Sequence, residues 1–278
     1  MHDLHGKTAL ITGAANPKGI GRRMAEVLGE AGASIIVADI DKTYLDSSAE
    51  DLKRLGIEAV SYDMDAGDKS EVDRTIGSML ESYSIDILIN NVGGTSKTDR
   101  ESVSGGRDIT TERKGPVLGI SNATEEQWDK IMKVNVNSAF YCSQAVLPHM
   151  MERGQGCIVN FASIAGQRGV LDTETFTSGP YAVAKSAVIG MTKQLAVETA
   201  AYGIRVNAVA PGFIKSARGA ALEELADEQK GALLNTVPMG RFGETEEIAQ
   251  VVLGLCSNQF SYVTGQTVSI NGGMYFSS

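Results

Sequence analysis

The feature that most constrains the fold is an alternation of short apolar segments with longer amphipathic ones. Segments 34–39 and 85–90 are apolar almost throughout and have the length of buried strands. Segments with helical spacing, such as 20–31 and 70–82, lie between such runs, and Ser70 is predicted to cap the second of these helices. Strands without a polar face belong to parallel sheets that helices cover on both sides. We therefore predict an α/β, Rossmann-like doubly wound fold with a seven-stranded parallel sheet.

The 278 residues contain no internal repeat and no linker, so residues 1–278 are predicted to form a single domain. A polar, glycine-containing stretch at about 93–122 interrupts the alternation and is predicted to be an inserted loop. Such long loops are usually functional or disordered. We expect it to fold beside the pocket or to contact a neighbouring subunit, with an exposed flap as the alternative. After it, Thr124 and Gln127 form a capping-box pattern that starts one long helix, to about residue 153.

Charge and composition exclude several classes of protein. The net charge is −9 and no basic stripe is present, so a nucleic-acid partner is not expected. No apolar run approaches the roughly 20 residues that span a bilayer, and the N-terminus does not resemble a leader peptide. Three scattered cysteines and three dispersed histidines predict buried thiols, no metal site and a cytoplasmic location.

A glycine-rich turn joins the first predicted strand to the first predicted helix. Gly13, Gly19 and Gly21 lie in it, where exposed backbone N–H groups and the helix dipole favour a pyrophosphate. Asp39 ends the second strand, where a carboxylate can accept both hydroxyls of an adenosine ribose and repel a 2′-phosphate. Strand, turn, helix and acid in this order predict a dinucleotide site.

A second polar pattern lies on a predicted helix at 179–202. Tyr181 and Lys185 are four residues apart and therefore share one face of an otherwise apolar helix. A cation one turn away favours the phenolate form of a tyrosine, which can then exchange a proton with a hydroxyl group. This spacing alone is common, and it gains meaning only beside the dinucleotide pattern.

Taken together, these motifs resemble the short-chain dehydrogenase/reductase family, in its single-domain branch. The resemblance runs from about Lys7 to Gly273. Its markers are the glycine turn, Asn90–Gly93, Asn135, Ser163, Tyr181 with Lys185, Pro211-Gly212 and Asn271-Gly272-Gly273.

The resemblance implies four catalytic residues. Tyr181 would be the general acid/base, and Ser163 would bind the substrate oxygen and stabilise its developing charge. Lys185 would bind the nicotinamide ribose and lower the pKa of Tyr181. Asn135 would hold a helix bulge and a water that links Lys185 to solvent.

It also implies a set of cofactor contacts along the carboxyl ends of the strands. The expected contacts are Gly13, Asn16, Gly19, Ile20, Gly21, Asp39, Ile40, Asp63, Met64, Asn91, Val92, Gly93, Tyr181, Lys185, Pro211, Gly212, Ile214 and Ser216. The segment at about 213–237 would be a substrate lid. The long apolar helices at 124–153 and 179–202 would pair between subunits in a homodimer or homotetramer.

Several features depart from the family pattern. Five residues instead of three separate Thr12-Gly13 from Gly19, as in enoyl reductases, whose tyrosine and lysine stand further apart than here. Ser163 and Tyr181 are eighteen positions apart, several more than usual. Asp39 favours NAD, whereas Lys18, Arg22 and Arg23 resemble the basic residues of NADP-dependent relatives. A like charge at close range is the stronger effect, so NAD is the expected cofactor, with NADP less favoured.

The expected function is hydride transfer between NAD(H) and a secondary alcohol or ketone, with Tyr181 as the general acid/base. One alternative is an NADP-dependent 3-oxoacyl thioester reductase, which exposed basic residues near the pocket would favour. The other is a nucleotide-sensing scaffold without catalysis. The substrate itself, a small molecule, has no motif that identifies it.

Overall fold

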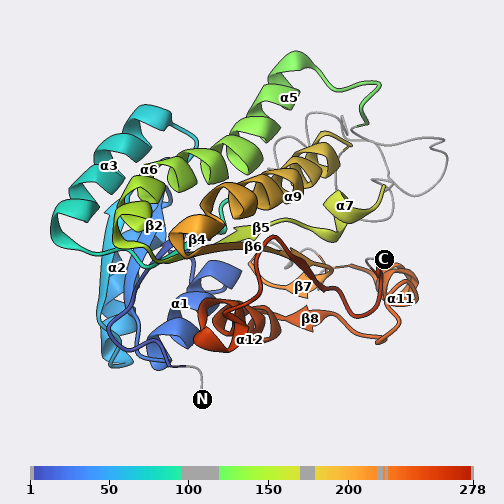
Figure 1. The fold of residues 1–278 in the computed structure, drawn as a ribbon. Coiled ribbons are helices and arrows are strands. Elements are labelled where there is room, and N and C mark those ends of the chain that lie inside the picture. Colours follow the sequence, from blue (N-terminus) through green and yellow to red (C-terminus); the bar gives the residue numbers. More distant parts are fainter. Residues whose placement is uncertain (1–2, 95–118, 170–178, 218–221, 223–224, 277–278) are drawn as a thin grey trace.

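The computed structural model describes residues 3–94, 119–169, 179–217, 222 and 225–276 (Figure 1). Its centre is a seven-stranded parallel sheet with the order β3-β2-β1-β4-β5-β6-β9, which confirms the predicted fold class. The strands are β1 Thr8–Thr12, β2 Ser34–Asp39, β3 Ala59–Asp63, β4 Ile87–Asn90, β5 Gly156–Phe161, β6 Ile204–Pro211 and β9 Thr267–Ile270.

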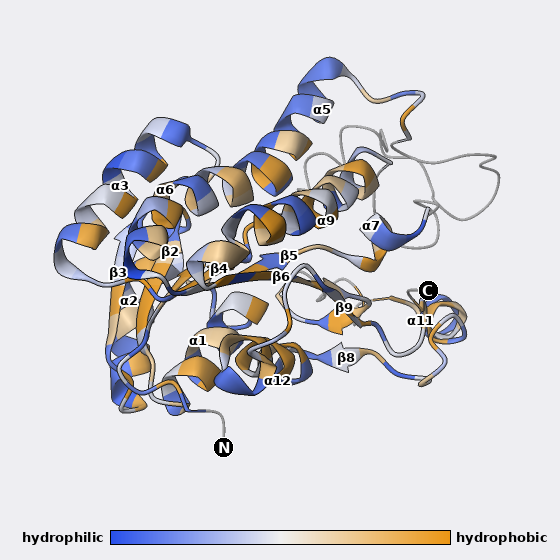
Figure 2. Cartoon of the chain, viewed as in Figure 1, coloured by the Kyte–Doolittle hydropathy of each residue, from blue (hydrophilic) through white to orange (hydrophobic). Residues whose placement is uncertain are grey.

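Helices cover both faces of this sheet, with α3, α6 and α9 on one side and α1 and α12 on the other (Figure 1). Apolar and polar residues alternate along these helices (Figure 2), and the buried apolar ones pack against the strands. The helices are α1 Ile20–Glu30, α2 Lys42–Arg54, α3 Lys69–Ser82, α5 Glu125–Met132, α6 Ser138–Arg153, α7 Ile164–Gln167, α9 Gly179–Thr199, α11 Asp227–Leu234 and α12 Thr245–Cys256.

A hydrophobic core lies on each face of the sheet, and alternate residues along a strand pack into one core or the other. In β1, Ile11 belongs to the core under α1 and α12, whereas Leu10 belongs to the core under α3 and α6. This two-residue alternation requires both sheet faces to be apolar, which explains the unbroken hydrophobic runs in the sequence. Strand β1 pairs with β2 on one side and β4 on the other, so the chain reverses its winding direction there. In open α/β sheets, ligands bind outside the carboxyl ends of the strands at such a point.

Two local predictions need correction. The N-cap of α3 is Asp68, whose carboxylate accepts from the backbone N–H of Glu71 at 3.0 Å, and Ser70 lies inside the helix. The predicted long helix after residue 124 is interrupted by a π-helical turn at Lys133–Asn137 that separates α5 from α6. The capping box of Thr124 and Gln127 is confirmed.

The sequence patterns gave no sign of a second, very small sheet. Ile214–Lys215 (β7) pairs in parallel with Gly243–Glu244 (β8), just before α12. Most of the predicted inserted loop, residues 95–118, lies outside the described residues, as does 170–178 between Ser163 and Tyr181. Within the described part of the chain, no helix has both the length and the apolarity to cross a bilayer.

Candidate active site

The glycine-rich turn brings the backbone of β1 into close contact with the start of α1. Gly13 has a φ of +68°, and a Cβ atom on Gly21 would lie 2.4 Å from the carbonyl oxygen of Gly13. Any side chain at Gly21 would therefore force the turn away from the helix. The side chain of Asn91, after β4, donates to the carbonyl oxygens of Gly13 at 2.8 Å and Thr12 at 3.0 Å. The turn is thus fixed to the strand beside it.

The additional residues of this turn form a compact structure of their own. The side-chain oxygen of Asn16 accepts from the N–H of Lys18 at 3.0 Å, and its carbonyl oxygen accepts from Gly19 at 2.9 Å. The carbonyl oxygen of Lys18 accepts from the N–H of Ala217 at 2.8 Å. The enlarged turn therefore contacts the segment that follows β7, a contact that the sequence did not indicate.

The predicted adenosine contacts gather at the carboxyl ends of β2 and β3, where Asp39 and Asp63 are register partners. One Asp39 oxygen accepts from the N–H of Ala15 at 2.9 Å, and the other accepts from Asp41 at 3.0 Å. These two bonds fix the carboxylate beside the glycine turn. Asp63 forms an ion pair with Lys42 at 2.7 Å. Next to Asp39, Ile40 is 61% exposed, whereas Met64 is buried.

The arginines that resemble NADP-binding residues are engaged elsewhere. Arg22 is only 5% exposed and forms ion pairs with Glu26 at 2.9 Å and Asp51 at 3.8 Å. Arg23 pairs with Glu26 and with Glu246 of α12. Both guanidinium groups therefore hold α1 against its neighbouring helices.

Helix α9 carries the tyrosine–lysine pair. Lys185 is 3% exposed, and its Nζ atom lies 5.7 Å from the centre of the Tyr181 ring. The same Nζ donates to the carbonyl oxygen of Phe161, at the end of β5, at 2.7 Å. The predicted sharing of one helix face is confirmed, and the cation is held between α9 and the sheet.

The segment after β4 lies close to the Lys185 ammonium. A Cβ atom on Gly93 would lie 2.6 Å from the Nζ of Lys185 and 2.8 Å from the side-chain oxygen of Asn135. Asn135 is 1% exposed and lies in the π-helical turn, where its amide donates to the carbonyl oxygens of Ile131 at 2.9 Å and Gly94 at 3.0 Å. Its side-chain oxygen accepts from the N–H of Gly94 at 2.6 Å. Asn135 thus fills the helix irregularity that the resemblance implied.

Ser163 lies two residues beyond β5 and caps α7, since its hydroxyl accepts from the N–H of Ala165 at 3.2 Å. Helix α7 packs closely on α9: a Cβ atom on Gly166 would lie 2.5 Å from the backbone of Lys185. The structure therefore brings the start of α7, the middle of α9 and the π-helical turn together at the carboxyl ends of β4 and β5.

The segment after β6 completes this edge. The N–H of Gly212 donates to the carbonyl oxygen of Ile270 at 2.9 Å, and a Cβ atom there would lie 2.9 Å from the Cα of Asn271. Pro211 is the last residue of β6, and Ile214 begins β7. Ser216 follows β7 directly.

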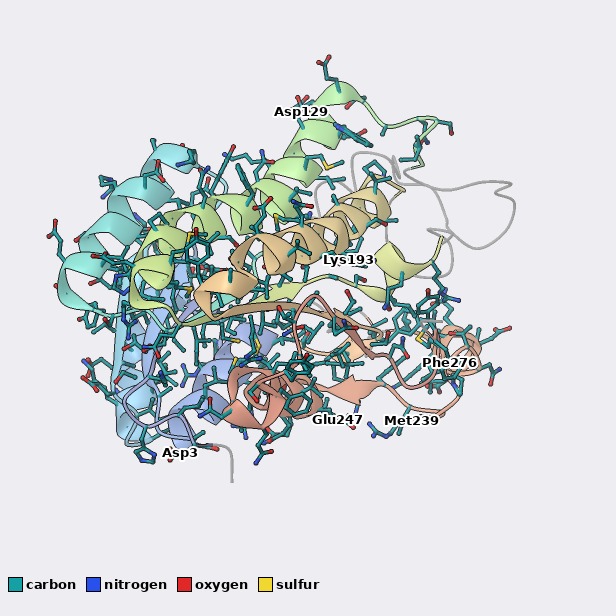
Figure 3. All side chains as sticks on the ribbon, in the orientation of Figure 1. Asp3, Asp129, Lys193, Met239, Glu247 and Phe276 are labelled. Atoms are coloured by element: carbon teal, nitrogen blue, oxygen red, sulfur yellow. The ribbon has the colours of Figure 1, made fainter. Side chains whose placement is uncertain are left out.

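A cavity of about 600 Å³ opens on this side of the molecule, between β7, β8, β9 and the C-terminal residues. Met239, Glu247 and Phe276 lie around it (Figure 3). It includes Ile214, but Asn135, Ser163, Tyr181 and Lys185 do not line it. The tyrosine–lysine pair therefore lies outside the lining of this cavity.

The predicted burial of the three cysteines is confirmed, and all three are free thiols. Burial raises the pKa of Cys142 to about 12, so this thiol stays protonated and unreactive at neutral pH. The described residues include no group of three or more side chains suited to a metal ion.

Comparisons with known proteins identify relatives over nearly the whole chain. The sequence model of a family described as "Enoyl-(Acyl carrier protein) reductase" matches residues 13–275. A 3-oxoacyl-[acyl-carrier-protein] reductase FabG of Thermotoga maritima is 37% identical over 272 residues, which cover 98% of each chain. The chain belongs to the short-chain dehydrogenase/reductase family. As a member of this family, it is an NAD(P)-dependent oxidoreductase.

Solved structures of this family show the same fold at full length. A 3-oxoacyl-[acyl-carrier protein] reductase with bound NAD from Brucella melitensis has a TM-score of 0.81 and 31% identity, covering 99% of this chain and 94% of that one. A putative gluconate dehydrogenase from Agrobacterium tumefaciens has a TM-score of 0.84 and 29% identity, covering 98% and 97%. These two relatives are described by different activities, of which the gluconate dehydrogenase is putative.

Proposed function

We propose that this enzyme transfers a hydride between NAD(H) and a secondary alcohol or ketone, with Tyr181 as the general acid/base. The observation that carries the proposal is the convergence of Tyr181, Lys185, Asn135 and Gly93 at one edge of the sheet, next to the glycine turn. A buried lysine beside a tyrosine favours the phenolate. In the oxidation direction the phenolate accepts the hydroxyl proton, and in reduction the phenol returns it.

Ser163 has the supporting role in this proposal. Its hydroxyl would donate to the substrate oxygen, where negative charge develops during the reaction. Its place at the start of α7, which packs on the Lys185 backbone, supports this assignment. Asn135 would keep the π-helical turn open toward Lys185, as its bonds to Ile131 and Gly94 suggest.

The residues at the glycine turn fit a dinucleotide. The close approach of Gly13 and Gly21 leaves no room for a Cβ atom, and the start of α1 offers the N–H groups and dipole that bind a pyrophosphate. When bound, the nicotinamide ring supplies the hydride site. We assign the contacts of the whole dinucleotide to the cofactor residues that the sequence predicted, from Gly13 to Ser216.

Charge favours NAD over NADP in this proposal. The Asp39 carboxylate is oriented by the N–H groups of Ala15 and Asp41, and it would repel a 2′-phosphate. Arg22 and Arg23 are engaged by carboxylates of α1, α2 and α12. The Brucella reductase with bound NAD supports the same cofactor for a 3-oxoacyl reductase of this fold.

Asp39→Ala tests this choice. Removing the carboxylate removes both the ribose acceptor and the anion, so kcat/KM with NAD should fall about tenfold while the value with NADP rises. The ratio of the two values, measured by nicotinamide absorbance, should move toward one. Asp73→Ala, which removes an exposed carboxylate of α3, is the control and should leave the ratio nearly unchanged. A wild-type enzyme that already prefers NADP would contradict the assignment.

For the substrate we propose a 3-oxoacyl thioester, which is a ketone, because of the 3-oxoacyl reductase of Thermotoga maritima that matches nearly the whole chain. The gluconate dehydrogenase structure favours a polyhydroxy acid as the second candidate.

We further propose a single domain, a homodimer or homotetramer, a lid formed by about 213–237 and a cytoplasmic location. Exposed Phe140 on α6 and Val183 and Val197 on α9 support pairing of these helices between subunits.

The deciding experiment supplies acetoacetyl-coenzyme A, gluconate and a panel of secondary alcohols and ketones, each with NAD(H) and NADP(H), and measures nicotinamide absorbance. We expect reduction of the thioester with NADH. Tyr181→Phe should lower that rate by about 10³-fold, in the range of general acid–base catalysis. Turnover of gluconate alone would select the second candidate, and full activity of Tyr181→Phe would contradict the mechanism.

A further inference from the structure

Beneath Lys185, a chain of polar side chains crosses the interior of the protein. It joins Asn90 of β4, Asn160 of β5 and Thr192 of α9, which are 3%, 0% and 0% exposed. The Asn90 amide donates to the Asn160 side-chain oxygen at 2.8 Å, and the Asn160 amide donates to the Thr192 hydroxyl at 2.9 Å. The Thr192 hydroxyl donates to the carbonyl oxygen of Val188 at 2.8 Å. Both connections between elements are thus made by side chains with complete burial.

Asn90, Asn160 and Thr192, the three hydrogen-bonded side chains, each lie close in sequence to Lys185 or to a group near it. Asn160 immediately precedes Phe161, whose carbonyl oxygen accepts from the lysine. Asn90 lies three residues before Gly93, where an added Cβ atom would lie 2.6 Å from the lysine Nζ. Thr192 lies seven residues after Lys185, about two helical turns along the same face of α9. This hydrogen-bonded series therefore fixes the segments of β4, β5 and α9 that meet at the Lys185 ammonium.

Stability alone does not require polar groups here. Replacing both partners of a buried hydrogen bond by apolar groups of the same shape can be nearly neutral. Directional bonds, in contrast, define one register between a helix and a strand, and apolar contacts define it less sharply. A small slide of α9 along β5 would move the lysine ammonium away from the Phe161 carbonyl and the tyrosine ring.

We propose that Asn160 and Thr192 are positioning residues, which hold Lys185 at the distance from Tyr181 that the proton transfer needs. This inference rests on the proposed function. Neither residue touches the reacting atoms; both act through the placement of α9 on β5.

The ionisation of Tyr181 responds to the position of the lysine, because the ammonium lies 5.7 Å from the centre of the tyrosine ring. Its described neighbours from α5 and the π-helical turn are apolar, namely Ile131, Met132 and Val136. The charged residues of α5 are exposed, and Lys133 pairs with Asp65. Helix α7, Ile164–Gln167, contains no ionisable side chain, and β5 contributes the Phe161 carbonyl. Lys185 is the cation that the described structure places against the ring.

The test is a Thr192→Val substitution, which keeps the shape and removes the hydroxyl. Tyr181 is titrated by tyrosinate difference absorbance, with a Tyr181→Phe version of each protein subtracted, so no substrate is needed. We expect the midpoint to rise by about one pH unit, because a displaced cation stabilises the phenolate less. Thr192→Ser keeps the hydroxyl and should retain the wild-type midpoint.

Ser143→Ala is the matched control. Ser143 of α6 accepts from the same Asn90 amide at 3.0 Å and is equally buried, but α6 does not carry the lysine. It should lower thermal stability without moving the midpoint. Should Thr192→Val not fold, Thr192→Cys carries the test with a smaller shift in the same direction. A wild-type midpoint in a folded Thr192 variant that lacks the hydroxyl would overturn the inference.

The kinetic readout separates this inference from the proposed function. With 3-hydroxybutyryl-coenzyme A and NAD, the acid limb of kcat/KM should shift to higher pH in Thr192→Val, while the high-pH plateau stays within about twofold. A uniform loss at all pH values would mean a merely structural role. An inactive wild-type enzyme would contradict the proposed substrate and leave the spectroscopic test of Thr192 decisive.

Discussion

The two ends of the sheet each bury a charged side chain, and they hold it in opposite ways. At the amino end, Asp86 is 4% exposed and accepts from Arg153 at 2.9 Å and the N–H of Thr8 at 3.0 Å, with Lys7 at 3.5 Å. At the carboxyl end, Lys185 donates to a carbonyl oxygen and faces an aromatic ring. Two cations compensate the first charge, whereas the second binds a carbonyl dipole and lies against the ring of Tyr181, on which its field acts.

The two buried charges have separate roles, one in stability and the other in chemistry. A buried carboxylate between two cations has little field left for other groups, so it serves to join β1, β4 and the end of α6. A buried ammonium held by dipoles still polarises its neighbour, which is useful in a proton transfer.

Lys185→Met tests the chemical role of the buried cation. Removing the cation should lower kcat/KM for the thioester by about 10³-fold, because the phenolate loses its partner. The free energy of unfolding should change little, since an apolar side chain of similar length also relieves the desolvation of a buried charge. Rates by nicotinamide absorbance and urea unfolding measure the two effects. A large stability loss with unchanged kcat/KM would assign Lys185 to the core instead.

Asp86→Asn should give the reverse result. It weakens the bonds from Arg153, Lys7 and the N–H of Thr8 to a buried acceptor, and because the two cations are 27% and 40% exposed we expect a loss of about 1–3 kcal/mol. We expect this loss in urea unfolding at neutral pH, with kcat/KM within about twofold of wild type. Asp73→Asn, in an exposed pair with Lys69, is the control and should change stability far less.

The sequence predicted best those features of the candidate site whose signals are local. The glycine turn, Asp39 and the tyrosine–lysine spacing each lie within a few residues, and the structure places them where the pattern indicated. The sheet was equally predictable, since a strand buried on both faces must be apolar throughout.

Other features depend on contacts between distant segments and had no local signal. The carbonyl oxygen that holds Lys185 belongs to Phe161, and any residue type could supply it. The β7–β8 pair joins residues almost thirty positions apart through two-residue strands. Asp68 rather than Ser70 caps α3 because both residue types are good caps, and only the backbone geometry decides between them.

The ion pair of Arg241 and Glu247 near the carboxyl end of the sheet is exposed, so it shows how burial, apart from position, affects the contribution of a charge to stability. Arg241 and Glu247 form two hydrogen bonds, at 2.7 and 2.8 Å, and their side chains are 48% and 41% exposed. The hydrogen bond from Arg241, followed by that from the N–H of Glu244, lowers the pKa of Glu247 to about 2. A carboxylate with a depressed pKa stabilises the fold above its unfolded pKa, and this contribution disappears as pH falls toward 2.

Glu247→Gln should therefore lower the free energy of unfolding only slightly. Solvent screens this pair, so the loss of stability at pH 7 should be well below that of Asp86→Asn. The difference from wild type should shrink further between pH 4 and 2, where the wild-type carboxylate itself becomes protonated. Urea midpoints at several pH values measure both statements. A loss as large as that of Asp86→Asn would mean that place in the sheet, rather than burial, decides how strongly a charge stabilises this fold.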